Sequence, residues 1–582
     1  MTNMTVSNMT VACLAAAWLA LAATPAARAQ SVPATALPQG SPLPAVVPRA
    51  APNVHPSPLI PAPPASANAA PATPVAIRRV AIEGATVFRH AVLSRLVGRI
   101  IGPAVPLTRV EAARLAVLQH YRAHGYVLTT VTAIIEADHT LRLRITEGRI
   151  AEVKLDGDIG PAGTQVLRFL NQLTKPKAIN TATLERYLLL AQEVPGVTVR
   201  AVLRPSTDQP GALTLIAQVN RRPVGGIFSA DNRAFNRAGP EEGLVVLDLN
   251  SFTQFGERTE LSLYRTFNAT QIFGQASTEV FLGSSGLRAK IYGGAGDATP
   301  SGDLRAAGYD GRTTVFGGQL SYPIIRSRQQ TLNVTGAFDA IQSTVYEGPS
   351  NALSEFSSDS LRILRLGAEY ARSDIWLGGE RAAVNTLALR VSRGLEGLGG
   401  SRNGTTTAPR QGERINFFKA DLDLSRTQTL FAPWRGASVA LMGVLSGQIT
   451  PDLLPPSEQY FLGGNRLDRG YYSGQVTGDN ALASTVELQL NTPTNFSLLG
   501  YDVEASAQFY GFYDWGETWQ NRKVDPNHHL QSFGLGVRMS LTRYTEIDLE
   551  GVRRLTIYPT GASTGVSALP TTAFYWRVLA RF

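Results

Sequence analysis

Phe461–Gln475 reads FLGGNRLDRGYYSGQ and combines charged side chains with glycines and aromatic rings. Within it, Arg469, Gly470 and Tyr471 directly follow the acidic residue Asp468. An arginine guanidinium forms planar, bidentate hydrogen bonds with a carboxylate, and a glycine lets the backbone pass close to another surface. These residue types predict an anchoring ion pair, and the question is which carboxylate the arginine meets.

The candidate for that carboxylate is Asp514, which lies in VEASAQFYGFYDW (Val503–Trp515). Polar residues occupy alternate positions of this segment, and the same parity places Phe512 and Asp514 on the polar face. We therefore expect Arg469 to pair with Asp514. We also expect Tyr471 to pack beside Phe512.

Alternation of this kind governs the chain from Val224 to Phe582, in about sixteen runs. In ALASTVELQLN the apolar face holds Leu482, Ser484, Val486, Leu488 and Leu490, and the other face holds Ala483, Thr485, Glu487, Gln489 and Asn491. Strands with one lipid-facing and one lumen-facing side are typical of outer-membrane barrels. The sequence predicts a mainly β fold with a 16-stranded antiparallel transmembrane β-barrel over residues 223–582.

The segment that carries the arginine lies between a strand ending near Thr450 and a strand beginning near Asn480. This interval is much longer than a hairpin turn. An irregular segment cannot face lipid, but it can line a water-filled cavity. We therefore expect the segment to fold into the barrel lumen, where Arg469 reaches the inward-facing Asp514.

The last strand favours a membrane barrel over a large soluble β-sandwich or propeller. Its apolar positions are Phe574, Trp576, Val578, Ala580 and Phe582, and the sequence ends on that final aromatic residue. A propeller would also show a repeat of about 40 to 50 residues, and we find none. We read Phe574, Trp576, Val578 and Phe582 as a C-terminal strand signal for barrel insertion, and we expect barrel-assembly machinery and outer-membrane lipids as partners.

Residues 1–29 are predicted to be a signal peptide, because an apolar run precedes small residues at Ala27 and Ala29, as in A-x-A cleavage sites. The only cysteine, Cys13, falls within it, so a mature chain has no thiol for a disulfide framework. Residues 30–74 form a Pro/Ala-rich linker, which we expect to be a semi-rigid, solvated tether.

Two similar α+β units follow, over residues 75–149 and 150–222. Each reads as a strand, two helices and two strands, and their opening strands are 73 residues apart. In the first unit, Thr108 and Glu111 are spaced as a capping box at the start of the second helix.

Composition argues against several classes of function. The formal net charge is +9, but the cations are spread along the chain, which disfavours a nucleic-acid patch. The seven histidines are scattered and show no metal-ligand spacing. No glycine-rich segment fits the phosphate-binding P-loop pattern. We therefore predict no enzyme, no cofactor, no metal site and no nucleic-acid partner.

The two α+β units resemble POTRA domains. Two such domains before a sixteen-stranded barrel with paired loop and strand motifs resemble the two-partner secretion transporters of the TpsB type. The loop motif here is Asp468-Arg469-Gly470-Tyr471, the strand motif is Phe512-Tyr513-Asp514 with Gly516 behind it, and FSADNRAFNRAG resembles the family's first barrel strand. The chain departs from the family in two places. Asp468 replaces a hydrophobic residue and is expected to compete for Arg469, and the tract 30–74 offers no helix to plug the pore.

The resemblance implies an outer-membrane pore of a Gram-negative bacterium, with its POTRA domains in the periplasm. Such a pore recognises an unfolded, TpsA-like exoprotein through the POTRA domains and translocates it to the cell surface. A barrel-assembly insertase of the same superfamily remains the alternative, although such proteins usually carry more POTRA repeats. A passive porin would have no use for periplasmic modules.

Overall fold

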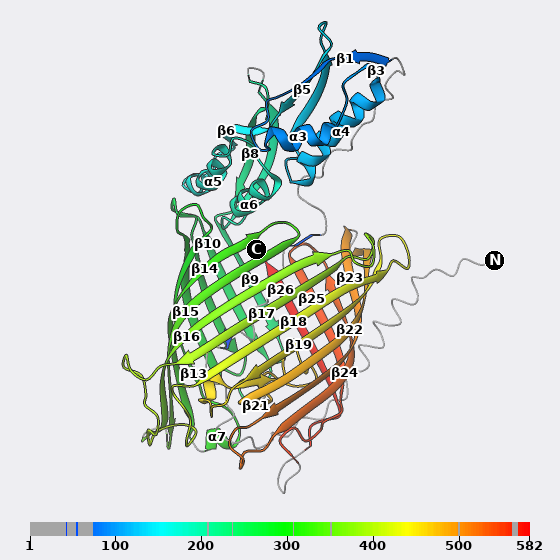
Figure 1. The fold of residues 1–582 in the computed structure, drawn as a ribbon. Helices are drawn as coiled ribbons and strands as arrows, with labels where there is room; N and C mark the ends of the chain where they lie inside the picture. Colours follow the sequence, from blue (N-terminus) through cyan, green and yellow to red (C-terminus); the bar gives the residue numbers. More distant parts are fainter. Residues whose placement is uncertain are drawn as a thin grey trace, which may run out of the picture.

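The computed structural model describes residues 42–43, 54–55, 74–206, 209–235, 237–306, 308–349, 352–498, 501–561 and 568–582. The predicted signal peptide, with Ala27 and Ala29, lies outside these residues. A closed barrel forms the larger part of the molecule, and two α+β units lie beyond one of its rims (Figure 1). None of the helices in the described ranges is long and apolar enough to cross a membrane.

Sixteen antiparallel strands close the barrel, which confirms the predicted fold. They are β9 (Val224–Asp231), β10 (Glu242–Asn250), β11 (Arg258–Thr266), β12 (Gln271–Phe281), β13 (Arg288–Ala298), β14 (Asp310–Arg326), β15 (Gln330–Glu347), β16 (Ser354–Asp374), β17 (Ala383–Gly394), β18 (Phe418–Phe431), β19 (Ser438–Ile449), β22 (Asn480–Leu498), β23 (Tyr501–Trp519), β24 (His528–Ser540), β25 (Thr545–Arg554) and β26 (Thr572–Arg581). Each strand pairs with its neighbour in the chain, and β26 pairs with β9 to complete the ring.

Alternate side chains of these strands face opposite surfaces, as the sequence pattern predicts. On β22, Val486 and Leu488 are more than half exposed on the outer surface, whereas Thr485 and Glu487 are buried. Since a closed barrel has no unpaired edge, every strand satisfies its backbone hydrogen bonds within the wall. The polar side chains are therefore collected in the lumen.

The last strand has the same two faces. Tyr575 is buried inside, and Arg577 forms ion pairs with Glu546 and Asp548 of β25. Phe574, Trp576 and Val578 have the opposite parity and therefore lie on the outer face. The Phe582 N–H donates to the carbonyl of Gly226 at 3.1 Å, and the Gly226 N–H donates back to Phe582 at 3.1 Å, so the C-terminal residue also pairs with β9.

The first α+β unit contains β1 (Pro74–Ile77), β2 (Arg79–Glu83), α3 (His90–Val97), β3 (Gly102–Pro106), α4 (Leu107–Ala123), β4 (Thr130–Ile135) and β5 (Thr140–Thr146). Its main sheet has the order β2-β5-β4, and β1 and β3 form a separate pair. This additional pair was not predicted. Leu93, Leu141 and Leu143 are fully buried between helices and sheet.

The predicted capping box is wrong. The N-cap of α4 is Pro106, and no side chain caps the helix. Glu111 instead forms an ion pair with Arg114, and Arg114 also donates to the carbonyl of Val131 at 3.0 Å. The pairing with Arg114 offers Glu111 a charged partner that the N-cap backbone does not.

Glu147 fixes the segment that enters α3. Its carboxylate accepts hydrogen bonds from the backbone N–H groups of Thr86 and Val87, at 2.9 and 3.0 Å, and from the Tyr121 hydroxyl at 2.7 Å. Burial opposes ionisation of Glu147, but these hydrogen bonds outweigh it and lower the pKa of its carboxyl group. The orientation of α3 is therefore set by a charged anchor at its start.

The second α+β unit contains β6 (Arg149–Asp156), α5 (Ala162–Leu170), η3 (Asn171–Thr174), α6 (Thr181–Gln192), β7 (Val197–Pro205) and β8 (Ala212–Arg221), with the sheet order β6-β8-β7. It packs directly on the barrel rim: Phe281 at the end of β12 belongs to its hydrophobic core. The Gln165 amide donates to the carbonyl of Gly283 at 2.8 Å. Arg186 donates to the carbonyls of Ser285 and Ile324, at 3.1 and 3.2 Å.

The described residues of the tract 30–74 contradict the prediction of a solvated tether. Leu43 is only 5% exposed and lies in a hydrophobic cluster with Leu244 of the barrel lumen. Val54 is also buried, and the N–H of His55 donates to the carbonyl of Arg328, in the turn after β14, at 2.7 Å. A large apolar residue in a Pro/Ala-rich sequence, such as Leu43, can thus be buried against an apolar patch of the lumen.

We predict that Trp576→Arg lowers the amount of assembled barrel, because a charge on the lipid-facing surface costs about 2–4 kcal/mol near the bilayer midplane. The control is Arg577→Gln, which removes ion pairs inside the wet lumen and should have a milder effect. The fraction of heat-modifiable protein in unheated gel samples measures assembly. Equal losses for the two variants would show that the faces of β26 are assigned wrongly.

Candidate functional site

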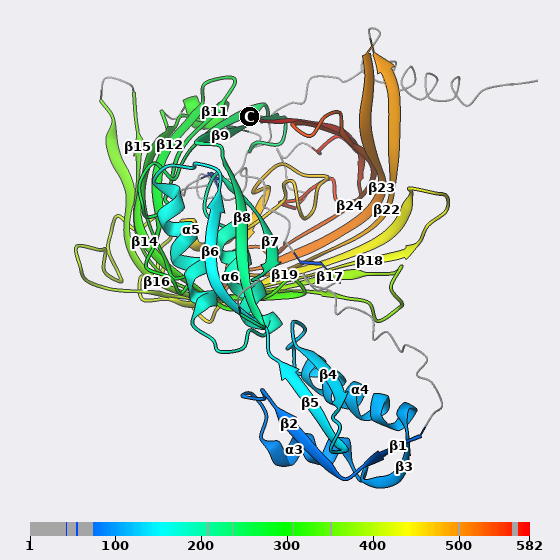
Figure 2. The ribbon, with the colours of Figure 1, turned by 90° about the horizontal axis from the view of Figure 1, so that it is seen from above.

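The segment between β19 and β22 folds into the barrel lumen, as its length predicts. It contains η4 (Pro456–Glu458) and a small hairpin of β20 (Tyr460–Leu462) with β21 (Val476–Gly478). Viewed along the barrel, this lumen loop lies inside the ring of strands (Figure 2). Its residues Leu454, Leu462 and Tyr471 are almost fully buried. The loop therefore fills part of the lumen without facing lipid.

Arg469 at the tip of the lumen loop contacts Asp514 of β23 through three hydrogen bonds. The backbone N–H and the Nε atom of Arg469 donate to Asp514 Oδ2 at 2.8 and 3.1 Å, and Nη2 donates to Oδ1 at 3.0 Å. Both side chains are buried, at 3% and 0% exposure. A bidentate, buried pair of this kind is a strong and directional contact.

A second carboxylate, Glu487 of β22, completes the site, and we did not predict it. It forms an ion pair with Nη1 of Arg469 and accepts from Nη1 and Nη2 of Arg538 at 2.7 and 3.2 Å. Two guanidinium groups thus alternate with the carboxylates of Glu487 and Asp514. Alternation had placed Glu487 on the lumen face, but the pairing depends on the register of β22 with β23, in which Glu487 lies opposite Phe512.

Aromatic rings of β23 form the floor beneath both guanidinium groups. The Arg469 guanidinium lies 3.6 Å from the centre of the Phe512 ring, and that of Arg538 lies 3.7 Å from the Tyr510 ring. The predicted packing of Tyr471 beside Phe512 is wrong: Tyr471 belongs to another cluster, and Tyr472 packs near Phe512. The face of the Phe512 ring is instead covered by the Arg469 guanidinium, and a cation is stabilised in this position.

Gly470 passes so close to the wall that no larger residue fits. Its carbonyl accepts from Arg554 Nε at 2.5 Å and from the Tyr575 hydroxyl at 3.0 Å, and its N–H donates to Ser532 Oγ at 3.2 Å. A Cβ atom on Gly470 would lie 2.6 Å from the Cβ of Ser532. The next residue, Tyr471, donates its hydroxyl hydrogen toward backbone carbonyls of the wall.

Asp468 does not compete for Arg469, contrary to expectation. It is fully buried, and neither of its carboxylate oxygens has a hydrogen-bond partner among the described residues. Its φ of 51° lies in the left-handed region, which is costly for most residues but tolerated by Asp and Asn. Gly516 makes room for it, since a Cβ there would lie 2.2 Å from Asp468 Oδ2.

Further ion pairs fix the rest of the lumen loop. At its end, Asp479 accepts from Arg410 Nη1 at 2.7 Å. Near its beginning, Glu458 pairs with Arg365 at 2.7 Å and with Lys419 at 3.0 Å. Together with Arg469, these contacts fix the loop to β16, to β18 and to the segment between β17 and β18.

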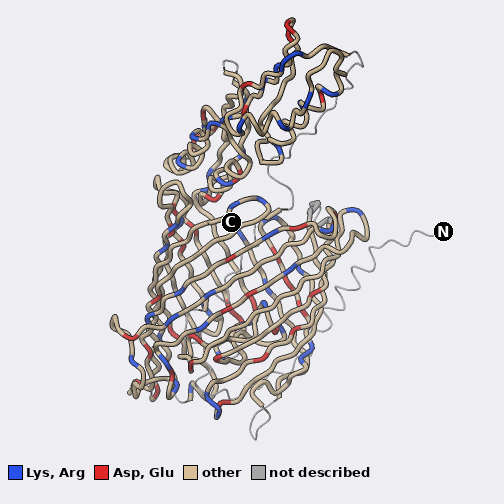
Figure 3. The backbone as a smooth tube through the Cα atoms, viewed as in Figure 1, with Lys and Arg blue, Asp and Glu red and all other residues tan. Residues whose placement is uncertain are grey.

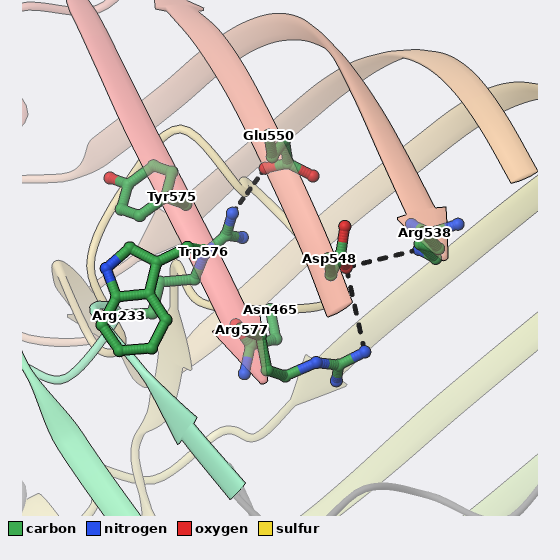
Figure 4. A pocket seen from close by; sticks show the side chains of 8 residues that line it. All are labelled: Arg233, Asn465, Arg538, Asp548, Glu550, Tyr575, Trp576 and Arg577. Atoms are coloured by element: carbon green, nitrogen blue, oxygen red, sulfur yellow. Dashed lines mark hydrogen bonds and ion pairs between the residues drawn. The ribbon is translucent and has the colours of Figure 1, made fainter. Parts of the chain in front are cut away.

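A polar cavity lies between the lumen loop and the wall (Figure 4). It is lined by Arg233, Asn465, Arg538, Asp548, Glu550, Tyr575 and Arg577, and it also touches Trp576, whose side chain has the outward parity on β26. Arg233, which follows β9, donates to Glu550 at 2.5 Å and to the carbonyl of Gly464 in the loop at 3.0 Å. Its own carbonyl accepts from the N–H of Ser473 at 3.0 Å. The segment after β9 therefore also holds the loop.

The arrangement is suited to holding and releasing a loop. Among the residues that the structure describes, no three His, Cys, Asp or Glu side chains are grouped as a metal site would require. Except for Asp468, the charged groups of the site form hydrogen bonds with each other and with the backbone. These hydrogen bonds and ion pairs can be replaced by hydrogen bonds to other polar groups, which would release the loop.

Sequence profiles of known families match both parts of the chain. The profile described as haemolysin secretion/activation protein ShlB/FhaC/HecB matches residues 213–539, and that of the ShlB-type POTRA domain matches residues 75–148. The outer membrane transporter CdiB of Escherichia coli is 21% identical over 420 residues, which cover 69% of this chain and 67% of that protein.

Solved structures of similar proteins show the same fold. CdiB from Escherichia coli superposes with a TM-score of 0.69 at 19% identity, and CdiB from Acinetobacter baumannii with a TM-score of 0.60 at 16% identity. Each comparison covers 90% of this chain and 94% of the other.

We predict that Arg469→Ala releases the lumen loop more readily than Asp514→Ala. Removing the arginine leaves Asp514 buried without its cation while Glu487 keeps Arg538, with an upper cost of about 3–5 kcal/mol for a fully desolvated pair. Removing Asp514 leaves Arg469 paired with Glu487. Pore conductance in planar bilayers measures loop release. The double variant should conduct no more than Arg469→Ala alone, and additive effects would show that the two residues act separately.

The exchange of Arg469→Asp with Asp514→Arg should restore little, because the new carboxylate on the loop would face Glu487. Full recovery in this exchange would mean that Glu487 contributes nothing to the site.

We predict that Asp468→Asn stabilises the docked loop by about 1 kcal/mol or more, since it removes a buried charge that has no partner. Asparagine also tolerates the left-handed backbone at this position. The pore should then conduct for a smaller fraction of time. The control is Asp423→Asn, which deprives Arg466 of its partner at 2.7 Å and should act in the opposite direction. Increased conductance in Asp468→Asn would show that the carboxylate holds the loop.

Proposed function

Because the chain belongs to the ShlB/FhaC/HecB family of haemolysin secretion/activation proteins, we propose that it carries an unfolded partner exoprotein from the periplasm through its barrel to the cell surface. It is a barrel of the outer membrane, and its POTRA domains lie in the periplasm. Transport then requires the partner to be recognised in the periplasm, to enter the barrel and to pass the lumen loop.

The observation that carries the proposal is the lumen loop with its ion pairs. A passage through the barrel requires the loop to move, and the contacts of Arg469 are polar groups that water or a passing polypeptide can replace. The lumen is polar, so opening the pair exposes the charges to a medium in which their attraction is weaker. The motif Asp468, Arg469, Gly470 and Tyr471 with Phe512, Asp514 and Gly516 thus acts as a latch.

Docking of the partner is assigned to the two POTRA domains, residues 75–149 and 150–222. Each has a three-stranded sheet with two edges, β2 and β4 in the first and β6 and β7 in the second. An extended segment of an unfolded protein can add to such an edge through main-chain hydrogen bonds. The linker 30–74 precedes the first domain, and the barrel occupies residues 223–582.

Insertion of the barrel itself is assigned to the barrel-assembly machinery, which would recognise the last strand. The motif residues are Phe574, Trp576 and Val578, on the outer face of β26, and Phe582, which directly follows β26 with the same parity. Because β26 closes the barrel against β9, its release from the machinery would coincide with closure.

We predict that deletion of residues 75–149 leaves an inserted barrel that no longer exports its partner. The first POTRA domain makes its own core, so the barrel does not depend on it for closure. Deletion of residues 150–222 should in addition lower the amount of barrel, because Phe281 loses its packing partners.

The partner exoprotein is measured in the medium and in the cells, with heat-modifiable barrel as the measure of insertion. Normal export after deletion of residues 75–149 would contradict the docking proposal. A general loss of other outer-membrane barrels, with export intact, would instead favour the insertase.

A further inference from the structure

The excess positive charge of the protein is concentrated in the two POTRA domains. Residues 75–222 contain twenty Lys and Arg and eleven Asp and Glu, and this difference of nine equals the formal net charge of the whole chain. The rest of the chain is balanced. The first domain alone has eleven cations and five anions over residues 75–149. Figure 3 shows Lys and Arg distributed over this domain, and alternating signs along the barrel strands.

Helix α3 lies in a part of that domain that carries positive charges and no negative ones. Residues 84–110 contain no Asp or Glu, but they include Arg89, Arg95, Arg99 and Arg109. Within the helix, Leu93 faces the core and is fully buried. Residues three and four apart share a helix face, so Val92, Arg95 and Leu96 lie together on the exposed side.

This exposed face combines free cations with uncovered apolar side chains. Val92 and Leu96 are each 36% exposed, and Ile101 just after the helix is 67% exposed. Other arginines of the domain have carboxylate partners, namely Arg79, Arg114 and Arg142. Within the described residues, Arg89, Arg95 and Arg99 form no ion pair with any carboxylate. Single exposed apolar residues are ordinary, but together with unpaired cations they are typical of an interfacial helix.

In projection along the barrel, the first POTRA domain lies over the lipid around the barrel, and α3 is farther from the rim than α5 and α6 (Figure 1 and Figure 2). Contact of α3 with the bilayer therefore requires the domain to tilt toward the membrane. Seen from above, the domain lies outside the barrel ring, beyond the wall formed by β17, β18 and β19 (Figure 2). The turns between β16 and β17 and between β18 and β19 carry strongly exposed residues, Ile375, Trp376, Leu377 and Trp434. Tryptophans are typical of the headgroup level of a bilayer, so the lipid surface continues outward from these turns beneath the domain.

We propose that the exposed face of α3, formed by Val92, Arg95 and Leu96 and flanked by Arg89, Arg99 and Ile101, rests on anionic phospholipids of the periplasmic leaflet. The arginines bind the phosphate groups, and the apolar side chains enter the headgroup region. The contact holds the first POTRA domain beside the barrel mouth, so that the mouth stays open to an arriving polypeptide. An acidic protein would satisfy the cations, but a bilayer also covers the apolar residues, and its surface extends beneath the domain (Figure 2).

The test uses the full-length protein in lipid nanodiscs. Cys13 falls in the predicted signal peptide, and the sequence holds no other cysteine, so Ala91→Cys gives the mature chain a single site for an environment-sensitive fluorophore on α3. Thr132→Cys on β4 is the control position for the label. We expect a blue shift at position 91 in discs containing phosphatidylglycerol, no shift in discs of phosphatidylcholine alone, and loss of the shift at high salt.

Charge reversal tests the face itself. Arg95→Glu with Arg99→Glu should weaken the phosphatidylglycerol-dependent shift by at least about tenfold in lipid titrations, since each arginine near an anionic surface contributes about fivefold. Arg78→Glu with Arg144→Glu changes the net charge equally at exposed positions of the same domain and should leave the shift nearly unchanged. All four residues are exposed, so the core is not disturbed.

Equal emission in both lipid compositions would overturn the proposal, as would equal losses in the two double variants. A shift that appears only with an added acidic protein, and not with phosphatidylglycerol, would overturn it in favour of a protein partner. The readout does not depend on export, so failure of the proposed transport function leaves it unaffected.

Discussion

The docked position of the lumen loop depends on one guanidinium group. Arg469 reaches from the loop to two strands at once, since it binds Asp514 on β23 and Glu487 on β22. Arg538 on β24 binds Glu487 from the other side, so three neighbouring strands share a single charge network. The network acts together with a hydrophobic cluster, in which Leu462, Leu467 and Tyr471 of the loop pack with wall residues such as Val444 and Leu530. Charge and apolar packing therefore both order the loop, and the charge network gives the contact its direction.

Close approach of the backbone is the second condition for this network. The two glycines at the site each make room for a different partner: Gly470 for Ser532 on the wall and Gly516 for the Asp468 carboxylate. The Asp468 carboxylate receives no stabilising hydrogen bond there, because its oxygens have no partner among the described residues. A buried carboxylate without a partner opposes the docked state. Arg469 thus stabilises the docked loop, whereas the buried carboxylate of Asp468 destabilises it. The free energy needed to release the loop is lower as a result.

The alternation of apolar and polar residues in the sequence was sufficient to predict the barrel, the two faces of its strands and the inward direction of Asp514. Those features follow from the two-residue period of a strand and from the exclusion of irregular backbone from lipid. Glu487 was on the predicted lumen face, but its partner was not identified because alternation says nothing of register between strands. Tyr471 was misplaced for a similar reason, since parity does not show which loop residue reaches a ring. Leu43 was missed because a Pro/Ala-rich composition conceals single apolar anchors.

The two POTRA domains differ in how firmly the barrel holds them. The second is tied to the rim by Phe281 in its core and by Glu193, which forms ion pairs with both Arg288 and Arg326. The first contacts the second through a few hydrogen bonds, such as the Ile179 N–H to the Gly148 carbonyl at 2.9 Å, and through Leu128, which packs against the core of the second domain. This junction is smaller than the one between the second domain and the rim, and each of its hydrogen bonds contributes only about 1 kcal/mol net. The position of the first domain is therefore open to control by whatever its own surface binds, and that surface carries most of the excess charge.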